Sequence, residues 1–137
     1  VIDRDIVHDC VIYSSTINIP CVVDAKRSPM LYSGAIIKAN SVWCETYASY
    51  FADVITYGPQ GPYVKDVKRS VVQDMPFVPC VNHVGAGDCF AAHMTLALAH
   101  GFSLKESAII AHSAGRVYVQ KRYNTPPMLA DILADIG

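Results

Sequence analysis

This sequence of 137 residues lacks the features that mark several classes of protein. Its formal net charge is only -1, so it has no excess of basic side chains with which to bind a nucleic-acid backbone. No apolar run approaches the roughly 18 to 20 residues that a membrane-spanning helix needs, and the first residues resemble no secretory signal. We therefore expect a soluble, cytoplasmic protein that binds neither nucleic acid nor membrane.

The cysteines and histidines show no spacing typical of a disulfide framework or a zinc site. The five cysteines are odd in number, lie at long and irregular intervals, and include no Cys-x-x-Cys pair. The five histidines have no close spacing with cysteine or carboxylate residues. We expect the cysteines to be small buried residues in a reducing compartment, and the histidines to be separate structural or surface residues.

The remaining composition predicts one domain spanning residues 1–137. Hydrophobic residues make up 52% of the chain, which is too many for a disordered segment and enough for a core. Helical spacing of apolar residues predicts a helix over the first dozen residues, before Pro20. Short β-branched or apolar runs predict strands at 21–24, 35–37 and 54–56.

Turn and cap residues divide the rest of the chain. Ser41 can cap a helix from about Val42 to Phe51, and a glycine and proline cluster predicts a turn at 58–62. A hairpin of 63–67 with 70–72 and an extended segment at 75–81 are expected next. Three helices are then predicted: 86–100 ended by Gly101, a second capped by Ser103 with Glu106, and a third capped by Thr125 with Pro126 as its first residue. Strands that alternate with helices indicate an α/β layered fold with a largely parallel sheet flanked by helices.

The segment Gly85-Ala86-Gly87-Asp88 lies where an extended stretch becomes a long helix. Two glycines there allow backbone N–H groups to face outward, and the helix adds its positive end, which together favour binding of a phosphate. A carboxylate repels a bound phosphate, so a carboxylate at this position is expected to have a chemical role, such as accepting a proton from a nucleophile. The alternative is a tight turn in which Asp88 only supports the start of the helix, because Gly-x-Gly alone is a weak signal of a phosphate site.

This segment and the two helices after it resemble the C-terminal signature region of the PfkB, or ribokinase-like, carbohydrate kinases. Three upstream segments are similar to motifs of the same family, in the same order. They are Val22–Lys26, which resembles a strand ending in Asp-Pro-Lys; Ala35–Asn40, which resembles the strand before Asn-x-x-Glu; and Val54–Gly61, which resembles Thr-x-Gly-x-x-Gly.

The resemblance implies phosphoryl transfer from ATP to a hydroxyl of a sugar or sugar phosphate, with Mg2+ as the metal. It implies Asp88 as the general base and the amides of Gly85, Ala86 and Gly87 as an anion hole. The other implied site residues fall into three groups: Asn40 and Glu45 near magnesium and the phosphates; Thr56, Gly58 and Gly61 at the nucleotide; and His112 and Ser113 at the adenine. For His112 and Ser113, a packed helix face is an equal alternative.

Two features depart from the family pattern. Trp43 stands where the family has the Glu of Asn-x-x-Glu, and Glu45, two residues later, points about 200° away on a helix. The resemblance also begins in the middle of the family's domain, at a chain that starts with Val1. We therefore expect only the C-terminal portion of a ribokinase-like fold, which pairs with a missing N-terminal half or forms a homodimer.

Two other functions remain open. A ribokinase-like module could bind a nucleotide or sugar phosphate without turnover, as suggested by Trp43 and by Asn82, which stands where many members of the family have Asp. A flavodoxin-like or Rossmann-type binder is disfavoured, because the glycine turn comes after the strands and not behind the first one. The strand pattern also bears a weak resemblance to the heptose-phosphate kinase branch of the family.

Overall fold

The computed structural model describes residues 4–26, 29–43, 51–65, 71 and 75–137. Within these residues, four strands form one mixed sheet in the order β1-β2-β3-β4. The strands are β1 (Val22–Asp24), β2 (Ile36–Asn40), β3 (Val54–Thr56) and β4 (Pro62–Val64). β1, β2 and β3 are parallel, whereas β4 pairs antiparallel with β3. The three predicted strands and the largely parallel sheet are confirmed.

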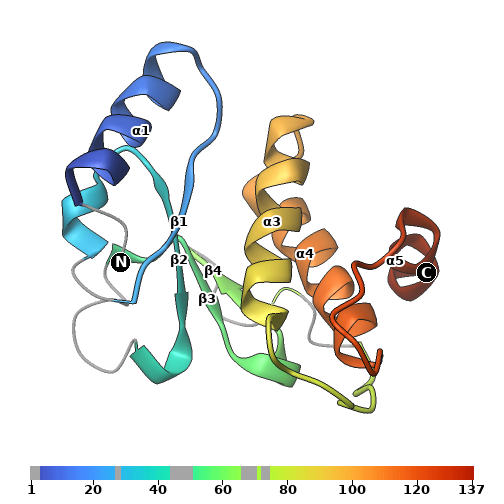
Figure 1. Ribbon diagram of the computed structural model, residues 1–137. Coiled ribbons are helices and arrows are strands. Elements are labelled where there is room, and N and C mark those ends of the chain that lie inside the picture. Colours follow the sequence, from blue (N-terminus) through green and yellow to red (C-terminus); the bar gives the residue numbers. More distant parts are fainter. Residues whose placement is uncertain (1–3, 27–28, 44–50, 66–70, 72–74) are drawn as a thin grey trace.

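Four α-helices have bounds within the described residues and flank the sheet (Figure 1). They are α1 (Arg4–Thr16), α3 (Ala86–Ala99), α4 (Leu104–Val119) and α5 (Leu129–Ile136). The sheet lies between α1 and the pair formed by α3 and α4, and α5 packs on α4 (Figure 1). None of these helices has the length and apolar character that would allow it to cross a membrane.

Side chains alternate between two cores along each strand, because successive residues of a strand point to opposite faces. On β2, Ile37 and Ala39 join one core, whereas Ile36 packs in a second core with Phe90 and Met94 of α3. Lys38, between Ile37 and Ala39, therefore points to the α3 side of the sheet. The same parity places Asp24 on that side, because Val22 joins the α3 core and Val23 the other.

The helices α3 and α4 begin and end close to the predicted residues. Gly101 follows α3 with φ 86°, a left-handed conformation that favours glycine. At α4, the Ser103 hydroxyl accepts from the Glu106 N–H at 3.3 Å, and the Ser103 N–H donates to Glu106 Oε2 at 2.9 Å. This is the predicted capping box.

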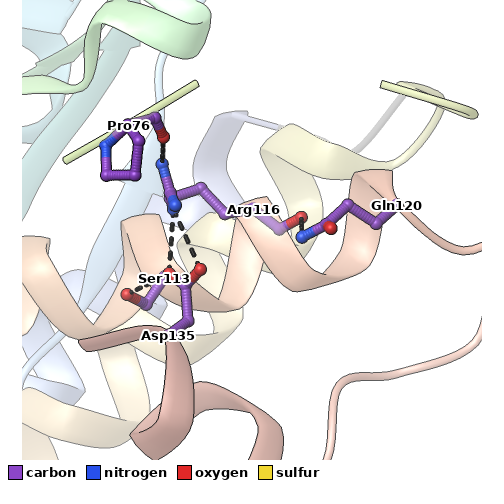
Figure 2. A network of polar contacts seen from close by, with 5 residues as sticks. All are labelled: Pro76, Ser113, Arg116, Gln120 and Asp135. Atoms are coloured by element: carbon purple, nitrogen blue, oxygen red, sulfur yellow. Dashed lines mark hydrogen bonds and ion pairs between the residues drawn. The ribbon is translucent and has the colours of Figure 1, made fainter. Parts of the chain in front are cut away.

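A buried network fastens α5 to α4 and to the extended segment 75–80 (Figure 2). Arg116 Nε lies 2.9 Å and 3.1 Å from the two carboxylate oxygens of Asp135, and Ser113 Oγ donates to Asp135 Oδ2 at 2.7 Å. Arg116 also donates to the carbonyl of Pro76 through Nη1. The side chains of Arg116 and Asp135 are about nine-tenths buried, so each charge depends on the other.

Another prediction about the chain was wrong. The last helix begins at Leu129, not at Pro126, because Pro127 follows Pro126 and a residue before proline is disfavoured in helical conformation. β4 pairs antiparallel with β3 across the glycine and proline turn. The predicted hairpin of 63–67 with 70–72 stays a prediction, because residues 66, 67, 70 and 72 lie outside the described residues. Of that expected second arm, the structure describes Val71, whose N–H donates to the Pro62 carbonyl at 3.1 Å.

At the segment after β2, a 3-10 turn (Ser41–Trp43) replaces the start of the predicted helix. In this turn, Asn40 Oδ1 accepts a hydrogen bond from the Val42 N–H at 3.1 Å. The rest of that predicted helix, through residue 50, lies outside the described residues. The expectation of buried cysteines was wrong for Cys10 and Cys80, which are exposed, whereas Cys21 and Cys89 are half-buried.

Candidate functional site

The carboxyl ends of the three parallel strands meet at one edge of the sheet. These ends carry Asp24, Asn40 and Thr56, and the register places Asp24 opposite Lys38 and Asn40 opposite Thr56. In open α/β sheets, ligands bind in the crevice beyond this edge. The polar residues that follow the apolar strands therefore share the position where a ligand site is expected.

A cavity of about 250 Å3 lies at this edge, between the strand ends and the amino terminus of α3. Its lining consists of Asp24, Lys26, Lys38, Asn40, Gly85, Gly87 and Asp88. The predicted site residue Asn40 thus meets Gly85, Gly87 and Asp88, which are distant from it in sequence, and Ala86 lies between the two lining glycines.

The amino terminus of α3 presents backbone donors to this cavity. Gly85 caps the helix with φ 85°, a left-handed conformation that a residue with a side chain rarely adopts. The Ala86 N–H donates to the His83 carbonyl at 3.1 Å, and the Cys89 N–H to the Gly85 carbonyl at 2.9 Å. The N–H groups of Gly87 and Asp88 find no acceptor among the described residues. The Gly85 N–H likewise finds no acceptor among the described residues, so these three are donors open to an anion in the cavity.

Lys38 is a site residue that the sequence-based prediction missed. Only 2% of it is exposed, and its ammonium lies 2.9 Å from Asp24 Oδ2. A methyl group at Gly87 would lie 3.5 Å from the same ammonium. A buried cation thus adjoins the positive end of α3, which strengthens the attraction of this cavity for an anion. The signal was a charge inside an apolar parallel strand, where buried lysines are rare unless paired.

Asp88 lies in the first turn of α3, exposed and at the cavity. Its carboxylate can therefore reach a ligand and exchange protons with it. The neighbouring Cys89 cannot act as a thiolate nucleophile, because burial raises the pKa of its thiol to about 11, against a smaller opposite effect of Lys121. Asp88 is the exposed carboxylate that this turn places at the cavity.

A family model described as pfkB family carbohydrate kinase matches residues 52–131, more than half of the chain. The chain belongs to the pfkB family of carbohydrate kinases. No curated protein matches it in sequence. The site described above combines the part of the chain that matches the family model with residues of β1 and β2 that precede it.

Solved structures of the ribokinase family share the fold of this pfkB-family chain. Ribokinase from Arabidopsis thaliana, solved with ribose and ATP, has a TM-score of 0.75 and is 18% identical over 98% of this chain. Phosphofructokinase-2 from Escherichia coli, solved with potassium, has a TM-score of 0.73 and is 21% identical over 98% of this chain. A nucleoside kinase from Methanocaldococcus jannaschii has a TM-score of 0.62 and is 16% identical over 81% of this chain. The predicted ribokinase-like fold is confirmed.

This chain spans about half the length of those kinases, covering 53% of the Arabidopsis ribokinase and 52% of phosphofructokinase-2. The similarity therefore concerns one part of their fold. The heptose-phosphate branch stays a prediction, because the structures named above are a ribokinase, a phosphofructokinase and a nucleoside kinase.

Of the residues predicted at the nucleotide, Thr56 ends β3, and Gly58 and Gly61 lie in the turn between β3 and β4. None of the three lines the cavity. Thr56 Oγ1 donates to the Ala39 carbonyl at 3.3 Å, which ties the end of β3 to β2. Gly58 and Gly61 have φ values of 55° and 87°, so the turn depends on both glycines. Their role at the nucleotide stays a prediction for this pfkB-family member.

His112 and Ser113 lie on the buried face of α4. Ser113 is fully buried, and its hydroxyl is engaged by Asp135 (Figure 2). His112 is 8% exposed, and its Nε2 has no partner among the described residues. The pKa of His112 is lowered to about 4, mainly by burial and also by the nearby Arg116, against a smaller opposite effect of Asp135. His112 is therefore neutral at pH 7, and the predicted adenine contact stays open for both residues.

Glu45, the predicted metal residue, lies outside the described residues. Of the residues that line the cavity, Asp24, Asn40 and Asp88 carry the oxygen donors that Mg2+ prefers. Asp24 and Asn40 each already accept one hydrogen bond, from Lys38 and Val42. No group of three or more histidine, cysteine or acidic residues placed to hold a metal occurs in the described parts of the chain.

Proposed function

We propose that this chain is the nucleotide-binding and catalytic part of a kinase that transfers the γ-phosphoryl group of ATP to a hydroxyl of a sugar or sugar phosphate. One observation carries the proposal: an exposed carboxylate, two helix-terminal N–H groups and a buried ammonium converge on one cavity. Phosphoryl transfer needs a proton acceptor and positive charge around the transferred group, and little covalent help from the protein.

In the proposed reaction, Asp88 accepts the proton of the attacking hydroxyl. The hydroxyl oxygen forms a bond to the γ-phosphorus while the bond from that phosphorus to the β-bridging oxygen breaks and ADP leaves. The turn Gly85-Ala86-Gly87 directs backbone N–H groups at the charge on the transferred group. The Gly85 and Gly87 N–H groups, and that of Asp88 after them, are available donors, whereas Ala86 already donates to His83.

Lys38 has a second role in this proposal. Its ammonium adjoins the amino terminus of α3 and is held there by Asp24, so it adds positive charge at a buried position. Charge in such a place acts more strongly on a phosphate than charge in bulk water does.

The cavity also fits a magnesium ion bound together with phosphates. Mg2+ binds through one or two carboxylates and keeps several waters, and Asp24, Asn40 and Asp88 offer the required oxygens. When bound with ATP, the ion would neutralise charge on the phosphates. Glu45 is proposed as a further residue near the metal, and Thr56, Gly58, Gly61, His112 and Ser113 as nucleotide contacts.

The sugar contacts are proposed to come from protein that covers β1. β1 ends the sheet among the described residues, and an uncovered edge strand of a parallel sheet tends to pair with further strands. The solved relatives are about twice as long as this chain. We propose that an N-terminal half, or a second copy, completes the acceptor site of a cytoplasmic enzyme whose residues 1–137 form part of one domain.

A second function is a module that binds a nucleotide or sugar phosphate without turnover and regulates another protein. The replacement of the family's Glu by Trp43 favours it, because that position organises magnesium in active members. Asp88 argues against it, since a carboxylate beside phosphates weakens their binding, whereas a kinase can use it to accept a proton.

Transfer of radiolabel from γ-labelled ATP, measured for the intact protein with a panel of sugars and sugar phosphates, distinguishes the two functions. The kinase proposal predicts a labelled, acid-stable sugar phosphate that requires added magnesium. Binding of ATP with no labelled product from any acceptor would contradict the kinase and support the binding module.

A further inference from the structure

The turn before α3 is held by Tyr118, a residue of α4. Tyr118 is 7% exposed, and its hydroxyl donates to the Val84 carbonyl at 2.8 Å. A methyl group built on Gly85 would lie 2.6 Å from this hydroxyl oxygen, which is closer than two such atoms can approach. The tyrosine therefore touches the helix cap itself and leaves space for glycine alone.

Two further hydrogen bonds attach the same turn to the end of α4. The N–H groups of Val81 and Asn82 donate to the Val119 carbonyl at 2.7 Å and 3.0 Å. Asn82 Oδ1 accepts from the Val84 N–H at 3.0 Å, so the turn is also braced from within. Residues 81–84 thus have a fixed position relative to α4 immediately before the cavity.

We propose that Tyr118 is a positioning residue for the phosphate site. The carbonyl that it holds belongs to the peptide between Val84 and Gly85, so the hydrogen bond sets the orientation of that peptide and with it the left-handed conformation of Gly85. That conformation determines where the next N–H groups point, including the Gly87 and Asp88 donors. Tyr118 itself does not line the cavity, so it acts through the turn.

The kinetic effect expected from this inference rests on the proposed function. The structural effect rests only on the contact of Tyr118 with Val84 and Gly85. A displaced donor loses hydrogen bonding to charge that develops in the transition state, which lowers kcat more than it weakens substrate binding. A tyrosine that only filled the core would change stability and leave kcat alone.

The kinetic test compares Tyr118→Phe with the matched control Tyr123→Phe, a tyrosine that is 72% exposed. In the intact protein, Tyr118→Phe should lower kcat about tenfold, as expected for loss of one well-placed hydrogen bond, with KM for ATP changed less than twofold. Tyr123→Phe should match the wild type. Unchanged kcat in Tyr118→Phe would overturn the proposal.

The structural test is a double-mutant cycle of Tyr118→Phe with Gly85→Ala, read from the equilibrium constant of unfolding. Removing the hydroxyl leaves the nearest ring atom 3.4 Å from the added methyl group. The factor by which Gly85→Ala raises the equilibrium constant of unfolding should therefore be at least tenfold smaller in the Tyr118→Phe background than in the wild type. Additive effects would overturn the contact between the two residues. This test needs no catalysis, so a protein without kinase activity would contradict the proposed function and leave the cycle valid.

Where Gly85→Ala does not fold, backbone chemical shifts of Tyr118→Phe give the same answer. We expect shift changes at Gly85, Gly87 and Asp88 that exceed those in the middle of α3. Changes confined to α4 would overturn the proposal, because the turn would then be independent of the hydroxyl.

Discussion

The ammonium of Lys38 lies 2.9 Å from Oδ2 of Asp24, and 2% of Lys38 is exposed. The side chain of Asp24 is 27% exposed, at the edge of the cavity. Without the Lys38 ammonium, the Asp24 carboxylate would lose its ion-pair partner. The pair therefore both holds the strand ends together and sets the charge of the site.

Lys38→Met should weaken both the fold and the binding of phosphate. We expect the free energy of unfolding to fall by about 2 kcal/mol, less than for a fully buried pair because Asp24 reaches water. ATP affinity should fall about tenfold, because a charge below the phosphate site is lost. Urea unfolding and calorimetric titration with ATP measure the two effects. The control, Lys105→Met, changes an exposed lysine on α4 and should leave both values as in the wild type.

Alanine at two helical glycines should have the same effect on stability but different effects on activity. A methyl group at Gly115 meets no atom within 4 Å, and one at Gly87 lies 3.5 Å from Lys38 Nζ, an ordinary contact distance. Both Gly115→Ala and Gly87→Ala should therefore raise the free energy of unfolding, by about 0.5–1 kcal/mol, through better helix propensity. Gly87→Ala alone should lower kcat/KM at least tenfold, because the methyl group stands where the phosphate approaches the amides.

Thermal unfolding and steady-state kinetics of these two variants separate stability from function. Equal activity in both variants would mean that Gly87 is needed only for the turn, as in the alternative interpretation of the Gly-x-Gly segment.

The stability of the protein should depend on pH through His112. Its pKa is lowered to about 4 by burial, whereas an unfolded histidine titrates near 6.5. Between these values the unfolded chain binds a proton that the native protein excludes, so the free energy of unfolding falls as the pH falls. From pH 7 to pH 5 the loss from this residue should be about 2 kcal/mol.

Urea unfolding at both pH values, for the wild type and His112→Gln, measures this loss. The variant should lose about 2 kcal/mol less than the wild type between the two pH values. His100→Gln, at an exposed histidine, should keep the wild-type dependence. The same dependence in the wild type and His112→Gln would show that His112 does not titrate in this range.

Local signals were sufficient to predict the strands, the α3 turn and the α4 cap. Glycine, proline and capping residues act on their immediate neighbours, so Gly85, Gly101 and Ser103 could be placed from sequence. The start of the last helix was misplaced for an equally local reason, because Pro127 restricts Pro126. The sequence pattern at that point favours proline as a first helical residue, and the second proline overrides it.

The contacts that complete the site could not be predicted from local patterns. The partner of Lys38 lies 14 residues earlier, and the two meet only through the register of β1 with β2. Tyr118 and Val84 are 34 residues apart and meet only because α4 packs beside α3. A lysine within an apolar run and a tyrosine on a helix indicate burial at most, until the packing of the strands and helices is known.

The most direct test of the proposed kinase is Asp88→Asn in the intact protein, with Asp9→Asn on the exposed face of α1 as control. Asparagine keeps the size of the side chain and cannot accept the hydroxyl proton. Phosphoryl transfer should fall by about 10²–10⁴-fold, the usual contribution of a general base, while ATP affinity stays the same or rises slightly because a negative charge is removed. Asp9→Asn should have no effect. Unchanged turnover in Asp88→Asn would contradict the proposed role of Asp88 and the mechanism built on it.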